Sequence, residues 1–341
     1  MRIVHAANLQ FCKQGAAFWN QDQKIHHGLL ELGHYVYTYS VNDMARQLGW
    51  FGKRDLGIKQ ANQALIKSCL NIEPDLLLLG HAQLISRETI ATIKQHLPKL
   101  KVALWYVDAL WIEDKVQHLH DRADLFDGLF CTTAGDSLTN ISHGKCRSAF
   151  IPNGVHKDIE NKQAFSQVQH EHDLIFIGSD RNDPQRQADL NSLKESLDDS
   201  IQFSLFGCLG NPSIFGKDKD SLMLHSKAAL NLSRHSEMLL YSSSRVAEMM
   251  GNGLLTCTPR GAELEQLYSE DEMLYYSSTE ELSERLVSLL KDDSWKDIAQ
   301  AGWERNHRDY NAKKVAKFML DFIYQDDAYK DVPWSNYTYL S

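Results

Sequence analysis

The stretch Tyr241-Ser-Ser-Ser-Arg-Val-Ala-Glu-Met-Met-Gly-Asn-Gly-Leu-Leu-Thr-Cys-Thr258 predicts a short helix that ends against a buried strand. Ser243 or Ser244 can cap this helix, and two glycines then end it. The apolar run from Leu254 to Thr258 predicts a strand that is covered on both faces. A helix followed directly by such a strand is typical of an α/β fold with a parallel sheet.

Two charged residues, Arg245 and Glu248, share the polar edge of this helix. Its first turn offers unpaired backbone N–H groups, a serine hydroxyl and an arginine, which together suit a phosphate. One turn further on, Glu248 can accept two hydrogen bonds from a vicinal diol, and phosphate with ribose means a nucleotide. The alternative is an ordinary surface ion pair between residues three apart, and spacing alone leaves both interpretations open.

The stretch has two recognisable flanks, Ala228-Ala-Leu-Asn-Leu-Ser-Arg234 before it and Ser278-Thr-Glu-Glu-Leu-Ser-Glu-Arg285 after it. With them it resembles the carboxy-terminal half of group 1 glycosyltransferases, in the branch of the bacterial spore-protein CgeB-like enzymes. The resemblance implies the GT-B fold, which is an α/β fold with two Rossmann-like domains facing each other across a cleft. It also implies a cytoplasmic enzyme of cell-surface polysaccharide biosynthesis, with at most peripheral contact with the inner membrane face.

The same resemblance assigns roles to individual residues. Glu248 is expected to hold the ribose of a nucleotide-sugar donor, while Ser244 and Arg245 face its diphosphate. The better-known relatives carry a second glutamate eight positions earlier, near the donor sugar, and this chain has Leu240 there. The sequence therefore does not predict which sugar is transferred.

The whole chain alternates predicted strands and helices in two halves. The first domain is expected to span residues 1–156 and to end at Ile151-Pro-Asn-Gly-Val-His156, which resembles the crossover before the second domain of these transferases. A linker over 157–171, a donor-binding domain over 172–312, and a returning helix with a tail over 313–341 complete the expected organisation. The expected strands are 3–6, 35–39, 76–79, 102–106, 129–131, 149–151, 174–178, 202–206, 229–232, 254–258 and 273–276.

Composition excludes several classes of protein. The 341 residues are enough for two cores, and 43% hydrophobic with 24% charged residues is typical of an ordinary globular protein. A formal net charge of −9 argues against broad binding to nucleic acid or to anionic membranes through bulk charge, and it leaves a local basic patch open. The six cysteines show no CxxC pair and are interpreted as buried reduced thiols, and no apolar run approaches the length of a membrane span.

Ligands of parallel sheets bind beyond the carboxyl ends of the strands, so the residues there are candidates. His81 follows the run Leu76–Gly80 and is interpreted as a base toward an acceptor hydroxyl or as a contact of the donor sugar. Asp108, after the next strand, either orients the acceptor or caps the following helix. Gly15 either brings the backbone close to a ligand or is a plain turn glycine.

A metal is not expected. Asp218-Lys-Asp220 matches the DxD pattern of metal-dependent transferases, but it lies in a charged, glycine-flanked run and is interpreted as a solvated loop. A further strand–glycine–helix turn at 174–186 offers Arg181 or Arg186 to a diphosphate. The predicted catalytic residues are His81 and Asp108, and the predicted donor-binding residues are Gly15, Gly178, Ser179, Arg181, Arg234, Tyr241, Ser244, Arg245, Glu248 and Gly253.

The predicted function is that of a metal-independent, retaining glycosyltransferase without a cofactor. Its partners are a nucleotide-sugar donor and a glycan, glycolipid or other hydroxyl acceptor. Two alternatives stay open: a nucleotide-sugar epimerase, and a GT-B module that binds a nucleotide or glycan without turnover.

Overall fold

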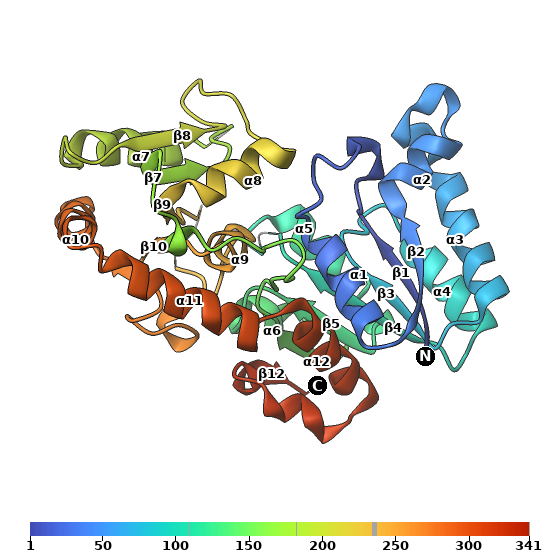
Figure 1. Cartoon of the computed structure of the whole chain (residues 1–341). Coiled ribbons are helices and arrows are strands. Elements are labelled where there is room, and N and C mark those ends of the chain that lie inside the picture. The colour runs from blue at the N-terminus through green and yellow to red at the C-terminus, as the bar shows by residue number, and fades with distance from the viewer. Residues whose placement is uncertain (109, 182, 234–236, 341) are drawn as a thin grey trace. The chain divides into compact units, whose positions relative to one another are not determined.

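The computed structural model describes residues 1–108, 110–181, 183–233 and 237–340. The chain divides into two compact units, which are described separately (Figure 1). Unit 1 consists of Met1–Gly154 and Ala312–Ser341, and unit 2 consists of Val155–Asn311. In the described part of the chain, no helix combines the length and the apolar character that crossing a bilayer would require.

Unit 1 is built on a seven-stranded sheet in the order β12-β6-β5-β4-β3-β1-β2. All neighbours pair in parallel except β12, which runs antiparallel to β6. The central strands are fully buried because helices cover both faces, and Leu76–Leu79 is apolar at every position for that reason. The strands are β1 Arg2–Ala7, β2 Tyr35–Ser40, β3 Leu76–Leu79, β4 Lys101–Tyr106, β5 Gly128–Cys131, β6 Ser148–Phe150 and β12 Thr338–Tyr339.

The helices of unit 1 form two layers. Contacts join α1 with α12, and α3 with α2 and α4 (Figure 1). A Cβ atom on Gly28 of α1 would overlap the backbone of Ala312 and Lys313, so α1 and α12 touch through a glycine. The α-helices are α1 Gln21–Glu31, α2 Val41–Leu48, α3 Ile58–Ile72, α4 Arg87–His96, α5 Glu113–His120, α6 Asp136–Ser142 and α12 Ala312–Tyr324. Short 3₁₀ helices are η1 Phe11–Lys13, η2 Trp50–Gly52, η3 Arg54–Gly57, η4 Ala123–Leu125, η7 Asp327–Asp331 and η8 Ser335–Tyr337.

Unit 2 is built on a five-stranded, fully parallel sheet in the order β11-β10-β9-β7-β8. Its core gathers apolar residues of these strands with Leu190, Leu286 and Trp295 from the covering helices. The strands are β7 His172–Ile177, β8 Phe203–Phe206, β9 Ser226–Leu230, β10 Leu255–Pro259 and β11 Leu274–Tyr276. The helices are η5 Ala164–Ser166, α7 Pro184–Ser196, α8 Gly216–Leu224, α9 Arg245–Gly251, η6 Leu264–Gln266, α10 Thr279–Lys291 and α11 Trp295–Asp309.

The predicted strands all overlap observed ones. The prediction of a loop at 218–220 was wrong, because these residues belong to helix α8. The segment 157–171, predicted as a linker, belongs to unit 2, where Ala164 is buried and its N–H donates to the backbone oxygen of Asn252 (3.0 Å). Cys12 is exposed, whereas the other five free cysteines are buried as predicted.

Candidate functional site

Two arginines meet at the carboxyl edge of the unit 2 sheet. Arg245, the first residue of α9, donates from Nη2 to the backbone oxygen of Leu232 (2.9 Å). Arg186, in the first turn of α7, donates to the same oxygen (3.1 Å) and to that of Ser179 (2.7 Å). Both guanidinium groups lie over the ring of Phe176, at 6.0 Å for Arg186 and 5.4 Å for Arg245. Because one carbonyl holds both groups, two positive charges are concentrated at one point, as a diphosphate requires.

The turn after β7 leaves room for these arginines. A Cβ atom on Gly178 would lie 3.2 Å from Nη1 of Arg245 and 2.8 Å from Cζ of Phe176, so a side chain there would displace the guanidinium. Arg181 lies in the same turn but is exposed, and its N–H donates to the Ser179 hydroxyl (3.2 Å). Of the two arginines that the sequence offered, the structure therefore turns Arg186 inward.

Glu248, the predicted ribose ligand, is buried and held from two sides. Its side chain is 3% exposed, Oε2 forms an ion pair with Lys219 of α8, and Oε1 accepts a hydrogen bond from the Ser244 hydroxyl (3.1 Å). The alternative of a surface ion pair between Arg245 and Glu248 was therefore wrong. Ser244 is the N-cap residue, but its hydroxyl makes no capping bond, and the Ser243 hydroxyl instead accepts from the Arg245 N–H (3.1 Å).

Lys219 was missed by sequence reasoning. It is the middle residue of Asp218-Lys-Asp220, and its side chain is buried while Asp218 is exposed. The helical period explains this difference, since neighbouring positions in a helix point to different faces. Its position three and four residues before an apolar pair, Leu222 and Met223, was the available signal, because this helical spacing places Lys219 on the same buried face of α8.

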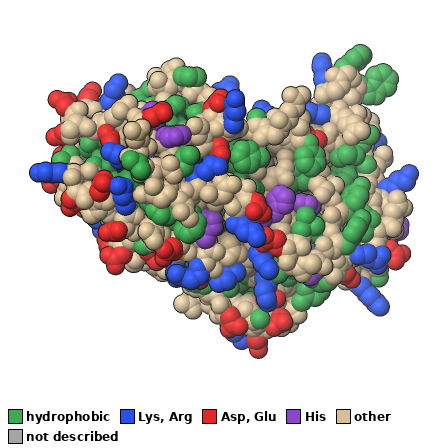
Figure 2. All heavy atoms as spheres, viewed as in Figure 1, with side chains coloured by type: hydrophobic (Ala, Val, Ile, Leu, Met, Phe, Trp, Pro, Cys, Tyr) green, Lys and Arg blue, Asp and Glu red, His purple; other side chains and the backbone are tan. Residues whose placement is uncertain are grey.

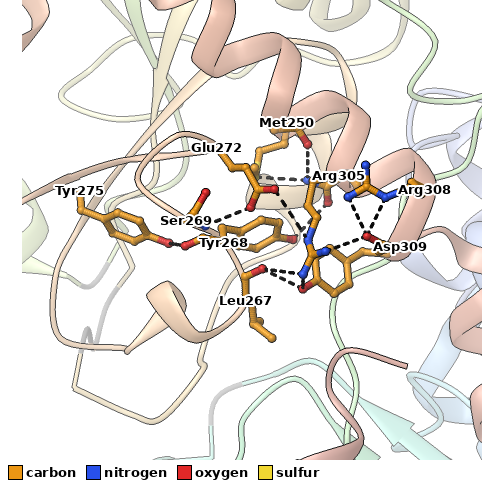
Figure 3. Close-up of polar contacts among 12 residues, drawn as sticks. Met250, Leu267, Tyr268, Ser269, Glu272, Tyr275, Arg305, Arg308 and Asp309 are labelled. Carbon is orange, nitrogen blue, oxygen red and sulfur yellow. Dashed lines mark hydrogen bonds and ion pairs between the residues drawn. The ribbon is translucent and has the colours of Figure 1, made fainter. Parts of the chain in front are cut away.

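A buried polar network supports α9 from α11 (Figure 3). Asn306 donates to Sδ of Met250 in α9 (3.3 Å) and accepts a hydrogen bond from the hydroxyl of Tyr268 (3.1 Å). The residue before it on the same helix, Arg305, donates to Asp309 (2.8 Å). The buried bonds of Asn306 to Met250 and Tyr268 favour one arrangement and thereby help to fix α9, which carries Arg245 and Glu248.

The other residues predicted to bind the donor are placed differently. Gly253 precedes β10 and thus lies at the amino edge of the sheet, where a Cβ atom would lie 2.7 Å from Cδ1 of Phe165, so the backbone packs closely there. Its binding of the donor stays a prediction. Tyr241 is half-buried just before α9. Leu240, at the position of the second glutamate of the better-known relatives, is fully buried. Arg234 lies outside the described residues.

The carboxyl edge of unit 1 carries a second cluster, centred on His81. Its Nδ1 lies 3.0 Å from Oδ2 of Asp22, and its backbone N–H donates to Oδ1 of the same carboxylate (3.3 Å). Its Nε2 lies 3.8 Å from Oδ1 of Asp108, which also accepts a hydrogen bond from Lys115 (3.0 Å). The side chains of His81, Asp22 and Asp108 are 20%, 1% and 32% exposed, so the histidine is reachable while its first carboxylate is not.

These charges set the protonation of His81. Burial lowers its pKa, but the carboxylates of Asp22 and Asp108 outweigh burial and raise the pKa to about 10. With this raised pKa the group is an imidazolium at neutral pH and donates hydrogen bonds. Its role in catalysis stays a prediction. Asp108 does not cap a helix, because α5 begins at Glu113 with Ile112 as its N-cap.

Asp22 was also missed, although it stands in the first turn of α1 directly after the loop that follows β1. Its N–H donates to the side chain of Asn20 (2.7 Å), which fixes the start of the helix. Gly15 in the same loop has φ 87° and open space around its Cβ direction, which fits a turn glycine. Its binding of the donor stays a prediction.

The chain is similar to known proteins in part of its sequence and in its fold. Residues 186–321 match the sequence model of a family described as glycosyl transferase-like, and no curated protein sequence matches the chain. The Anabaena protein HepE, solved in complex with UDP-glucose, is similar in structure with a TM-score of 0.59 at 13% identity, over 95% of this chain and 100% of that chain. AviGT4, a glycosyltransferase involved in avilamycin A biosynthesis, also has a TM-score of 0.59 at 13% identity, over 95% and 97% of the two chains.

A glycosyltransferase from Rickettsia africae is similar as well, with a TM-score of 0.51 at 11% identity, over 95% of this chain and 98% of that chain. The CgeB-like branch stays a prediction. The chain therefore has the GT-B fold, and residues 186–321 carry a glycosyl transferase-like domain, as the predicted enzyme class requires.

Proposed function

We propose that the protein transfers a sugar from a nucleotide-sugar donor to a hydroxyl group of a glycan, glycolipid or similar acceptor. The observation that carries the proposal is the pair Arg186 and Arg245, whose guanidinium groups share one backbone acceptor at the carboxyl edge of the unit 2 sheet. The family match over residues 186–321 and the UDP-glucose bound by the similar HepE support it.

In this proposal the nucleotide binds to unit 2. The two guanidinium groups bind the diphosphate, and Glu248 accepts hydrogen bonds from the ribose hydroxyls. Each carboxylate oxygen of Glu248 already accepts one bond, from Ser244 or Lys219, and has a second lone pair for a ligand. Lys219 offsets the cost of burying this charge. α9 has only two turns, so the arginine side chains rather than the helix terminus carry the argument for a phosphate.

The chemistry follows from the charges. When the bond between sugar and diphosphate breaks, negative charge grows on the leaving group, and two fixed guanidinium groups stabilise it without reorganising. The reaction proposed is metal-independent and retaining, and the departing phosphate itself takes the acceptor proton. Within unit 1, His81 as an imidazolium is a hydrogen-bond donor for an oxygen of a substrate that this unit binds.

The proposed setting is bacterial cell-surface polysaccharide biosynthesis at the cytoplasmic side of the membrane. The donor class is tested by isothermal titration calorimetry with UDP, GDP and ADP and with their glucose conjugates. We expect one of these nucleotides to bind, and UDP is the first to test because HepE binds it.

Variants locate the site. Arg186→Gln and Arg245→Gln each remove charge-assisted hydrogen bonds, so we expect affinity for the nucleoside diphosphate to fall roughly 10–100-fold. Glu248→Gln should weaken binding of the nucleotide but leave binding of inorganic pyrophosphate unchanged. Arg308→Gln is the matched control, since this arginine is exposed on α11 of the same unit.

Two outcomes would contradict the assignment: the same loss of affinity in the Arg308 variant, or normal nucleotide binding by the Glu248 variant. Turnover is then followed by NMR of the sugar product, whose anomeric configuration tests the retaining outcome. Nucleotide binding without product from any donor and acceptor would favour a binding module.

A further inference from the structure

Unit 1 carries an unusual group of exposed side chains, which we call the aromatic–basic patch. Trp50 and Phe51 at its centre are 71% and 91% exposed. Burying such side chains is strongly favourable, so large apolar groups that cluster in water mark an interaction surface. The patch consists of the exposed apolar residues Phe11, Leu48, Trp50, Phe51 and Leu56 and the exposed basic residues Lys13, Arg46, Lys53 and Arg54.

The fold holds these side chains outward in defined positions. Phe51 has φ 57°, a left-handed conformation that a bulky residue adopts only when its surroundings impose it. The loop closes on itself, because a Cβ atom on Gly57 would lie 2.6 Å from the backbone nitrogen of Gly49. Asp43 of α2 accepts a hydrogen bond from the backbone N–H of Phe11 (2.9 Å), which holds the loop after β1 against α2 and thus joins Phe11 to the rest of the patch.

The patch lies at the carboxyl edge of the unit 1 sheet. Phe11 follows β1 and α2 follows β2, and these strands run parallel to β3 and β4, which end next to His81 and Asp108. The carboxyl ends of parallel strands share one edge, so the patch and His81 are on the same side of this sheet. Figure 2 shows hydrophobic side chains with a basic one beside them projecting over the end of unit 1 where α2 lies.

We propose that the aromatic–basic patch docks unit 1 on an anionic membrane surface. Tryptophan and phenylalanine rings insert at the level of lipid headgroups, and lysine and arginine beside them attract acidic lipids. The patch holds four basic side chains against two acidic ones, Asp43 and Asp55. Backbone N–H groups engage Asp43, and Asp55 pairs with Arg54 (2.9 Å), so the local excess is two positive charges. Anionic lipid repels the chain as a whole, because its net charge is −9. The local excess of positive charge therefore determines which face of unit 1 approaches the membrane.

The position of the patch also indicates the acceptor. A surface that rests on the membrane beside His81 gives that edge of the sheet access to a sugar or hydroxyl on a lipid headgroup. We therefore assign the acceptor to the class of lipid-linked hydroxyl compounds. This last step rests on the proposed transferase function, whereas membrane binding does not.

Co-sedimentation of the full chain with vesicles tests the docking. One set of vesicles contains phosphatidylcholine alone, and the other contains phosphatidylcholine with phosphatidylglycerol. We expect binding to the anionic set only, weakened by salt. Lys53→Gln with Arg54→Gln should lower the partition coefficient on the order of 30-fold, and Trp50→Ser with Phe51→Ser should lower it at least as much. The control, Val168→Ser with Phe215→Ser, alters two exposed apolar residues of unit 2 and should bind normally.

Equal binding by all variants, or no binding to anionic vesicles, would overturn the proposal. Analytical ultracentrifugation of the same variants tests whether the patch instead binds a second copy of the chain. If the wild type is a dimer and Trp50→Ser with Phe51→Ser is a monomer, the patch is a dimer interface. Nucleotide titrations of the variants keep the two proposals separate, since a failure of membrane docking leaves nucleotide binding by unit 2 intact.

Discussion

Asp22→Asn removes the carboxylate that holds His81 and changes almost nothing in shape. The side chain of Asp22 is 1% exposed, and its Oδ2 lies 3.0 Å from Nδ1 of His81. Asp22 and Asp108 together raise the pKa of His81 from 6.5 to about 10 against the effect of burial. One opposite charge at this distance is worth about 1–3 pH units, so we expect the variant to have a His81 pKa of roughly 7–9.

The same substitution changes stability in a pH-dependent way. The pKa of His81 is higher in the folded chain than in the unfolded one, so its protonation stabilises the fold fully below pH 6.5 and less as the pH rises toward about 10. The lost charge corresponds to ~1.4–4 kcal/mol of unfolding free energy. Because the His81 side chain is 20% exposed, solvent screens part of this and the lower half of the range is expected.

NMR titration of the His81 ring measures the pKa directly, with the resonances assigned through His81→Gln. Urea unfolding below pH 6.5 and near pH 10 measures the stability difference, which should shrink at the higher pH. Asp108→Asn is the control, since its carboxylate is 3.8 Å away and more exposed, so a smaller fall in pKa is expected. A wild-type pKa at or below 6.5, or an unchanged pKa in the Asp22 variant, would refute the reasoning.

Two further predictions concern buried charge. Lys219→Met leaves the carboxylate of Glu248 buried without its ammonium partner and should destabilise unit 2 by about 3–5 kcal/mol. Adding Glu248→Leu should recover most of this loss of stability. Equal unfolding free energies of the single and double variants in urea would show that the two residues do not act as a pair. Burial, with the charge of a neighbouring histidine, lowers the pKa of His5 to about 3 and that of His26 to about 4. Between pH 6.5 and 4 the folded chain therefore binds fewer protons than the unfolded one. As the pH falls through this range, the free energy of unfolding decreases by roughly 1.4 kcal/mol per histidine for each pH unit. His5→Phe should halve the combined slope in urea unfolding across that range, and an unchanged slope would assign the acid sensitivity to other groups.

Much of the fold could be predicted from the sequence because local burial leaves a local pattern. A strand covered on both faces is largely apolar, and Leu76–Leu79 carries that signal without reference to any other part of the chain. Ser278 likewise predicted the start of α10, and its hydroxyl accepts the N–H of Glu281 (3.1 Å). Short helices such as α6 and the two-residue strand β12 left no such pattern, since β12 exists only by pairing with β6.

The sequence by itself determined the order of the elements and the edge of each sheet where ligands of parallel sheets bind, and it singled out Arg245 and Glu248 as candidates. The tertiary structure alone decided which side chains meet there. Arg186 joins Arg245, Lys219 joins Glu248, and Asp22 joins His81, each across separate elements of its unit. The physical reason is that hydrophobic periodicity reports how much each segment is buried, whereas partners are chosen by the strand order and by helices packing across it.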